Sequence, residues 1–308
     1  MYFDTHCHLN FKAFDGQVGK VIDEAKKAGV NNIIVPGTNV LTSQKAVEIA
    51  EKYDGVFAAV GIHPHHVYQY KKVENLSLRA EAKQSRKEIA TLPSVARDDI
   101  NEIEKLLLHP KVVAVGEIGM DKHYYQKTKY KNYQIDPELV EGQKDLFIEQ
   151  IKLAHRYKKA LIIHNREAHL RQGFGGQAKK DVLEILTNHQ SLITSHSSVF
   201  HCCEPDGELL DFAKKNNIFI GVDGDITYRK DKQEFIKKVP LDLLVLETDS
   251  PFLTPKLVIR RSSYNYLNNY NEPKNIPLIA EFIAELLHCS IDSLAKQTTE
   301  NAKRLFQI

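Results

Sequence analysis

The chain has 308 residues, of which 42% are hydrophobic and 27% are charged, and 42 basic against 40 acidic side chains leave a formal charge of +2. This length suits one large α/β domain, which can bury its core without disulfides or a structural metal. The near balance of charge argues against a protein that coats duplex DNA through a global positive field, but it allows a small local phosphate pocket.

The cysteines and the first residues bear on the cellular compartment. Cys7, Cys202, Cys203 and Cys289 form neither a disulfide-rich pattern nor a Cys-x-x-Cys pair. A polar residue is reached by position 4, and no run of 18 apolar residues occurs. We therefore expect no signal peptide and no transmembrane helix, and we predict a cytoplasmic protein that does not bind membranes.

Short apolar runs alternate with amphipathic helical segments along the chain. The expected strands are residues 2–4, 31–35, 56–60, 112–115, 160–163, 199–200, 218–220 and 243–246. The expected helices are residues 18–25, 43–53, 100–108, 146–157, 181–186, 209–215, 276–287 and 302–306. Strands that are apolar at consecutive positions suit a sheet covered on both faces.

This rhythm predicts an α/β fold, a (β/α)8 TIM barrel, in which the active site lies at the C-terminal ends of the strands. A doubly wound open sheet is the competing layout, and it would place ligands at one switch point instead of at several strand ends. We interpret residues 1–308 as a single barrel domain with insertions near 66–99 and 168–178. The first insertion is polar and charged, with a solvated helix expected around 77–89. The second is rich in glycine but lacks the Lys-Ser/Thr ending of a P-loop, which favours a flexible surface loop.

Ligand-type side chains follow five of the expected strands. They are His6, His8, Glu117, His164, His201 and Asp249. Imidazole and carboxylate groups bind hydrolytic metals such as zinc, manganese and magnesium. Each residue alone could be an ordinary surface side chain, but their convergence at one end of a barrel predicts a metal site. His196 competes with His201, and Glu247 with Asp249; spacing alone does not choose between them.

Some of these side chains have a more specific expected role. His6 and His8 are two residues apart on a strand, so both can reach one ion. Glu117 has glycines on both sides, which lets the backbone approach an ion closely, and its carboxylate could bridge two metals. Asp249 could bind a metal and also accept a proton from the attacking water.

Further residues are candidates for substrate contacts. Arg166 follows His164 by two positions and suits a bidentate phosphate contact, although a structural ion pair is an equal alternative. His63 and His65 follow the third strand, and we interpret them as contacts to the substrate or to the metal ligands, with His66 exposed to solvent. Residues 254–273 interleave basic and tyrosine side chains, which fits either nucleic-acid stacking or a plain cover over the barrel mouth.

Taken in order, these motifs resemble the TatD family of metal-dependent deoxyribonucleases, which belongs to the amidohydrolase-like superfamily. The matching blocks are His6-x-His8, Gly61-x-His63-Pro64-His65, Gly116-Glu117-Ile118-Gly119, His164-x-Arg166-x-Ala168, His201-Cys202, Glu247-Thr248-Asp249-Ser250-Pro251, Asn271-Glu272-Pro273 and Thr298-Thr299-Glu300-Asn301-Ala302. Each block is weak alone, but the ordered set covers nearly the whole chain and is specific.

The resemblance implies a (β/α)8 barrel and two divalent metal ions, with a range of one to three in the family. It assigns the ligands to His6, His8, Glu117, His164, His201 and Asp249, and it favours His201 over His196. In the implied mechanism Glu117 bridges the two ions, and Asp249 helps a water to lose its proton and attack phosphorus. The implied substrate is DNA, cleaved as by an exonuclease at single-stranded or frayed 3′ ends, and no obligate protein partner is implied.

Two other functions remain open at this point. The same constellation could hydrolyse a carboxylic ester, a lactone or an amide, or the barrel could be a binding module without catalysis. Three features also depart from the family pattern: Cys203, the glycine-rich insertion, and Asp223 where serine or threonine is usual. We expect them to affect substrate preference and to leave the metal site intact.

Overall fold

The computed structural model describes residues 1–70, 94–125, 128, 130, 133–168, 177–193, 197–256 and 270–308. Eight parallel strands form one sheet in sequence order, each paired with the next along the chain. The strands are β1 (Tyr2–Asp4), β2 (Val30–Pro36), β3 (Val56–Val60), β4 (Val112–Asp121), β5 (Ala160–Arg166), β6 (Ser198–Phe200), β7 (Phe219–Val222) and β8 (Leu244–Leu246).

Contacts between the first and last strands close the sheet into a barrel. The backbone N–H of Thr5 donates to the carbonyl of Leu246 at 3.0 Å, and Cys7 forms a parallel bridge with Ser250. The predicted TIM barrel is therefore confirmed, and the open sheet is excluded. Cys7 is fully buried in the core, as expected for a strand residue between two inward-facing histidines.

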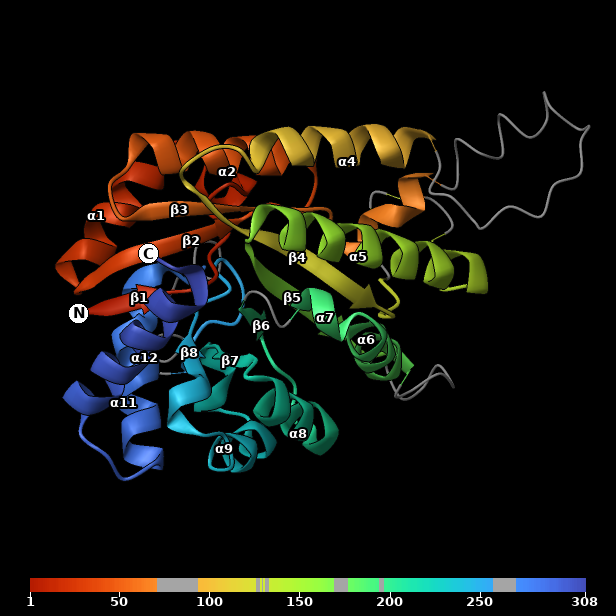
Figure 1. The fold of residues 1–308 in the computed structure, drawn as a ribbon. Helices are drawn as coiled ribbons and strands as arrows, with labels where there is room; N and C mark the ends of the chain where they lie inside the picture. Colours follow the sequence, from red (N-terminus) through yellow and green to blue (C-terminus); the bar gives the residue numbers. More distant parts are fainter. Residues whose placement is uncertain are drawn as a thin grey trace, which may run out of the picture.

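Helices surround the strands (Figure 1). They are α1 (Val18–Lys27), α2 (Val40–Lys52), α4 (Ser94–Leu106), α5 (Pro137–Tyr157), α6 (Gln177–Asn188), α7 (Gln190–Ile193), α8 (Gly207–Asn216), α9 (Lys230–Ile236), α11 (Ile276–Leu286) and α12 (Ile291–Phe306). Short 3-10 helices lie at Lys12–Phe14, Pro64–Val67, Gly224–Thr227, Leu241–Leu243 and Pro273–Asn275.

The apolar strand residues divide between two cores, which explains why the strands are apolar at consecutive positions. Ile33 and Val35 of β2 pack in a large core with the helices, whereas Ile34 between them packs in a smaller one. The smaller core takes similar positions from the other strands and includes Phe306 of α12. Alternating side chains thus point outward to the helices and inward to the barrel, as in TIM barrels.

Several elements are longer than the sequence predicts, among them β4, β5, α5 and α12, the last of which was expected only over residues 302–306. β4 continues to Asp121 and β5 to Arg166, so Glu117 and His164 lie within strands instead of beyond them. Helix α5 begins at Pro137, nine residues before the predicted start, where the Asp136 side chain accepts a hydrogen bond from the backbone of Leu139 at 2.9 Å. An acidic cap followed by proline is a common helix start.

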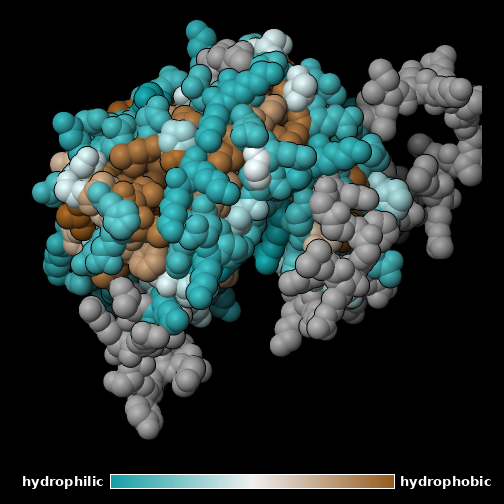
Figure 2. Space-filling view, turned by 90° about the horizontal axis from the view of Figure 1, so that it is seen from below, coloured by the Kyte–Doolittle hydropathy of each residue, from teal (hydrophilic) through white to brown (hydrophobic). Residues whose placement is uncertain are grey.

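The two expected insertions lie largely outside the described residues. Residues 71–93 and 169–176 are not described, and with them the helix expected around 77–89. The described end of the first segment is part of α4. The face seen in Figure 2 is mainly hydrophilic, with apolar side chains gathered on its left and toward its upper middle. Within the described residues, no helix is both long enough and apolar enough to cross a membrane.

Candidate metal centre

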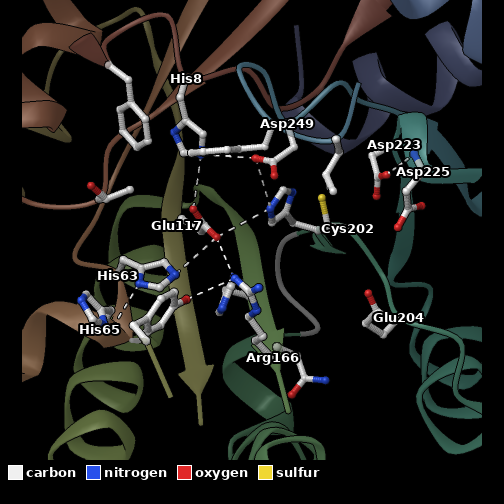
Figure 3. A pocket seen from close by; sticks show the side chains of 18 of the residues that line it. His8, His63, His65, Glu117, Arg166, Cys202, Glu204, Asp223, Asp225 and Asp249 are labelled. Atoms are coloured by element: carbon white, nitrogen blue, oxygen red, sulfur yellow. Dashed lines mark hydrogen bonds and ion pairs between the residues drawn. The ribbon is translucent and has the colours of Figure 1, made fainter. Parts of the chain in front are cut away.

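The C-terminal ends of the strands open into a cavity of about 670 Å³. Residues at the ends of all eight strands, or in the loops that follow them, line it. Among the lining residues are His8, His63, Glu117, His164, Arg166, His201 and Asp249. Figure 3 shows Glu117 near the middle of this group, with His8, His63 and Arg166 around it. The structure therefore brings together the ligand candidates that the sequence placed at separate strand ends.

A bulge in β4 turns Glu117 into the barrel. Val115 pairs with Leu161 and Ile118 with Ile163, so three steps along β4 correspond to two along β5. The extra residue shifts the alternation of side chains. Ile118 and Met120 then pack in the outer core, while Glu117 lies among the histidines.

Gly119 lets β4 and β5 approach each other beside the site. It has a φ of +135°, and a Cβ atom there would lie 2.1 Å from the carbonyl oxygen of His164. Only glycine accepts both the conformation and the contact. The second glycine of the sequence motif therefore sets the position of His164 relative to Glu117.

The Glu117 carboxylate is the hub of the cluster. Its Oε1 lies 2.7 Å from Nδ1 of His164 and 3.6 Å from Nε2 of both His63 and His201. Its Oε2 lies 3.7 Å from Nε2 of both His6 and His8. One buried carboxylate thus faces five imidazoles on its two oxygens.

The first and last strands supply a second part of the cluster. Asp249 Oδ1 lies 3.4 Å from Nε2 of His8 and 3.9 Å from Nε2 of both His6 and His201. Asp249 has a φ of +50° and donates its backbone N–H to the carbonyl of His6 at 2.9 Å. Aspartate tolerates this left-handed conformation better than most residues, although a cost remains.

A buried aspartate joins these two strand ends. Asp4 is fully buried and accepts hydrogen bonds from the Thr248 hydroxyl at 2.6 Å and the Thr248 backbone at 3.0 Å. It also accepts one from the backbone of His6 at 3.2 Å. These bonds fix the backbone on which His6 and Asp249 stand.

A third group contains a residue that the sequence reasoning missed. Asp121 is fully buried, and its Oδ2 lies 3.2 Å from Nε2 of His164 and 4.0 Å from Nε2 of His63. Because β4 runs on to Asp121, positions 117, 119 and 121 share one side of the strand. Extending the predicted strand past Val115 would have revealed it. His63 also lies closer to the ligand candidates than we expected.

The carboxylates and burial set the protonation of the histidines. Burial lowers the pKa of His164 and His201, but the neighbouring carboxylates outweigh burial and raise these pKa values to about 9 and about 10. For His6, burial and His201 lower the pKa to about 4. Burial also raises the pKa of Glu117, but His63, His164 and His6 outweigh it, and the net shift is well below the usual value.

The donor set fits divalent metal ions. Nε2 of His6 and Nε2 of His8 lie 3.2 Å apart, and both face the carboxylates of Glu117 and Asp249. The opposite nitrogens, Nδ1 of His6 and His8, are buried and have no hydrogen-bond partner among the described residues. Buried polar nitrogens normally have partners, and convergent imidazole and carboxylate donors are ligands of zinc, manganese and magnesium.

His201 and Glu247 form a pair at the edge of the cluster. Nδ1 of His201 lies 3.2 Å from Oε1 of Glu247, which also accepts a hydrogen bond from the backbone of Cys202. Carboxylates in this position orient the ring of a metal-binding histidine. The competing candidate His196 lies outside the described residues.

The candidate substrate residues Arg166, His63 and His65 also line the cavity. The Arg166 guanidinium is exposed; it stacks 5.5 Å from the Tyr125 ring centre and donates to the Tyr125 hydroxyl at 3.3 Å. His65 lies 3.0 Å from the Thr128 hydroxyl. His66 is half-buried against the Tyr130 hydroxyl at 2.8 Å, so its expected exposure was wrong.

The chain is similar to known proteins over its full length. A model of a family described as TatD related DNase matches residues 3–307. An uncharacterized metal-dependent hydrolase, YabD of Bacillus subtilis, is 33% identical, with 100% of each chain covered. A protein named 3′-5′ ssDNA/RNA exonuclease TatD, from Erwinia tasmaniensis, is 30% identical, with 99% of this chain and 100% of that one covered. The crystal structure of YjjV, a TatD homologue from Escherichia coli, superposes with a TM-score of 0.73 at 27% identity, covering 100% of this chain and 98% of that one.

Proposed function

The chain belongs to the TatD-related DNase family of metal-dependent hydrolases, and from this we propose that it removes nucleotides from the 3′ ends of single-stranded or frayed DNA. One observation carries the proposal beyond the family. The buried carboxylate–histidine cluster and the exposed guanidinium of Arg166 line the same cavity, so a phosphate group could meet both at once.

The residues fit two divalent ions that share Glu117. His6, His8 and Asp249 would hold one ion, and His164 and His201 the other. His63 and Asp121, which lie against His164, could complete the second set or hold a third ion. Bound divalent ions supply Lewis acidity, which activates water and offsets the charge that develops on phosphoryl oxygens.

The protein's own residues would divide the remaining work. The Asp249 carboxylate would accept the proton of the attacking water, since it faces the cavity beside both imidazoles of the first strand end. Arg166 would pair with the phosphoryl oxygens through its forked N–H groups. Glu247 would keep the His201 ring in orientation.

A labelled oligonucleotide tests this function. A single-stranded DNA with a 5′ label and a free 3′ end is incubated with the protein and added magnesium or manganese, and the products are separated by length. We expect stepwise shortening from the 3′ end. A parallel panel of carboxylic esters, lactones and amides tests the alternative. Turnover of a panel member without any shortening of DNA would contradict the proposal.

A further inference from the structure

The cavity has a second charged region next to the metal cluster. Glu204, Asp223 and Asp225 lie together on one side of it, away from His63 and His65 (Figure 3). Arg229 and Lys232 line the same side. None of these five residues belongs to the metal-binding set described above. We call the five residues together the carboxylate wall.

The two cations of the wall, Lys232 and Arg229, form ion pairs with carboxylates. Lys232 Nζ lies 2.8 Å from Asp223 Oδ2 and 2.6 Å from Asp225 Oδ1, and the residue is only 1% exposed. Arg229 contacts Glu204 at 2.8 Å and Asp225 at 3.3 Å on one side. On the other side it contacts Asp231 at 2.5 Å. Both cations are therefore already paired with carboxylates, and Lys232 is buried as well.

The wall carries a net negative charge when its carboxylates are ionised, since its three carboxylates face two cations. For Asp223, burial opposes ionisation, but Lys232 outweighs burial and lowers the pKa to about 2. Burial and the neighbouring Asp223 raise the pKa of Asp225 to about 7. Above neutral pH both aspartates are therefore charged. Arg166, in contrast, has an exposed guanidinium in the same cavity.

The backbone holds the wall in place. Asp223 accepts a hydrogen bond from the backbone of Asp225 at 2.8 Å, across the turn at Gly224. A Cβ atom on Gly224 would lie 2.2 Å from the carbonyl oxygen of Leu253, which also lines the cavity. The loop after β7 is thus packed tightly against the loop after β8, and the aspartates cannot easily turn away from a ligand.

We propose that Asp223 and Asp225 make this side of the cavity select an uncharged, hydrogen-bond-donating end of the substrate, such as a free 3′-hydroxyl, over a terminal phosphate. The inference rests on the proposed function, because it assumes that a DNA end enters the cavity. Carboxylate oxygens accept hydrogen bonds from a hydroxyl but repel a phosphate monoester. The wall would thus act as a specificity determinant, with the scissile phosphate on the Arg166 side.

Two oligonucleotides that differ only in their 3′ group test the inference. Hydrolysis of a 3′-hydroxyl and a 3′-phosphate DNA is compared at pH 8 with added magnesium. We expect the wild-type protein to prefer the hydroxyl by at least about tenfold in kcat/KM, the order expected from one unit charge near a partly desolvated site. The Asp225→Asn variant should lose most of this preference, and Asp225→Glu should keep it. Equal rates for the two wild-type substrates, or an unchanged preference in Asp225→Asn, would overturn the inference.

The matched control is Glu234→Gln, which removes the same charge from α9 at a side chain that is 69% exposed and pairs with Lys237. It should leave the preference unchanged. Thermal unfolding of each variant shows whether it is folded. A folding defect in Asp225→Asn would shift rates on both substrates together, and the ratio would still report the role of the wall.

A binding measurement distinguishes failure of the proposed function from failure of the inference about the carboxylate wall. Thymidine 5′-monophosphate and thymidine 3′,5′-bisphosphate are titrated into the protein by calorimetry. Discrimination against the bisphosphate without DNA hydrolysis would contradict the proposed function and support the wall. DNA shortening with no discrimination between 3′-hydroxyl and 3′-phosphate in either assay would support the proposed function and contradict the inference about the wall. Failure of both nucleotides to bind would also count against it.

Discussion

The metal cluster and the carboxylate wall border the same cavity, but they satisfy their buried charges differently. In the wall, Lys232 and Arg229 meet the carboxylates directly. In the cluster, carboxylates face imidazoles, and the buried Nδ1 atoms of His6 and His8 have no partner within the described part of the chain. Protons held by His164 and His201 supply the positive charge there. Buried charge must be neutralised in either case. The wall does this with residues of the chain, whereas the cluster is built to do it with ions from solution.

The largest expected effect on activity is that of a substitution at Asp249 in the metal cluster. Replacing it by Asn keeps its shape but removes the proton acceptor and one ligand charge, so we expect kcat on DNA to fall by about two to four orders of magnitude. Circular dichroism should show an unchanged fold. Near-normal turnover by a folded Asp249→Asn protein would rule out its role as the proton acceptor.

Substitutions in the carboxylate wall should lower the stability of the protein, whereas substitutions in the metal cluster should lower its catalytic rate. Lys232→Met leaves Asp223 buried without its cation and leaves Asp225 with Arg229 alone, and we expect it to lower the free energy of unfolding by about 3–5 kcal/mol. Lys237→Met is the control, since Lys237 is 44% exposed, and it should change stability by no more than about 0.5 kcal/mol. Denaturant unfolding compares the two. A similar small effect for both would mean that the wall does not depend on Lys232.

Added metal should stabilise the protein through the cluster alone. Magnesium, manganese or zinc at about one hundred times its dissociation constant should raise the free energy of unfolding by about 2.7 kcal/mol. Thermal unfolding should show the increase in the wild type and in Asp225→Asn, and a much smaller one in His8→Gln. An equal loss in both variants would show that the two regions are not independent.

The raised pKa values of His164 and His201 predict the direction in which metal affinity changes with pH. His164 and His201 titrate at about 9 and about 10, so both are protonated at pH 7 and must lose their protons to bind a metal. Metal affinity should therefore rise with pH from 7 towards 9. Calorimetry in buffers of different ionisation enthalpy should detect the released protons. Binding with no proton uptake by the buffer would contradict the raised pKa values.

The smallest expected effect lies at Arg166. Its guanidinium is exposed, so Arg166→Gln should leave stability unchanged. Loss of its charged hydrogen bonds to phosphate should lower kcat/KM on DNA about tenfold. Steady-state kinetics with DNA and with a neutral ester give the test. Equal losses on both substrates would mean that Arg166 does not recognise phosphate.

Much of the barrel and most of the cluster could be predicted, because both depend on local patterns. Apolar runs marked the strands, and His6, Glu117 and Asp249 stood beside them. Asp121 was missed because the apolar run ends at Val115, while the strand continues with polar residues that face the cavity. The roles assigned to the site residues remain predictions, as do the single-domain layout and the cytoplasmic location.

The wall could not be predicted in the same way, because it depends on side chains that meet only after folding. The sequence drew attention to Asp223 as an added charge, but nothing in it paired that aspartate with Lys232 on a later helix. Asp225 was not singled out in the sequence. Its position beside Asp223 follows from the tight turn at Gly224, which is set by contact with a loop from the next strand.

The seam that closes the barrel also carries the cluster. Asp4 and Thr248, which are 244 positions apart, are joined there by hydrogen bonds. Contacts between such distant residues form late in folding, because a long loop must close, at a cost in entropy, before these contacts can stabilise the structure. A growing chain would therefore carry every histidine of the first strand end long before it could use them. Hydrolytic activity would arise only once β8 has docked, so partly made molecules would be inactive during their own synthesis.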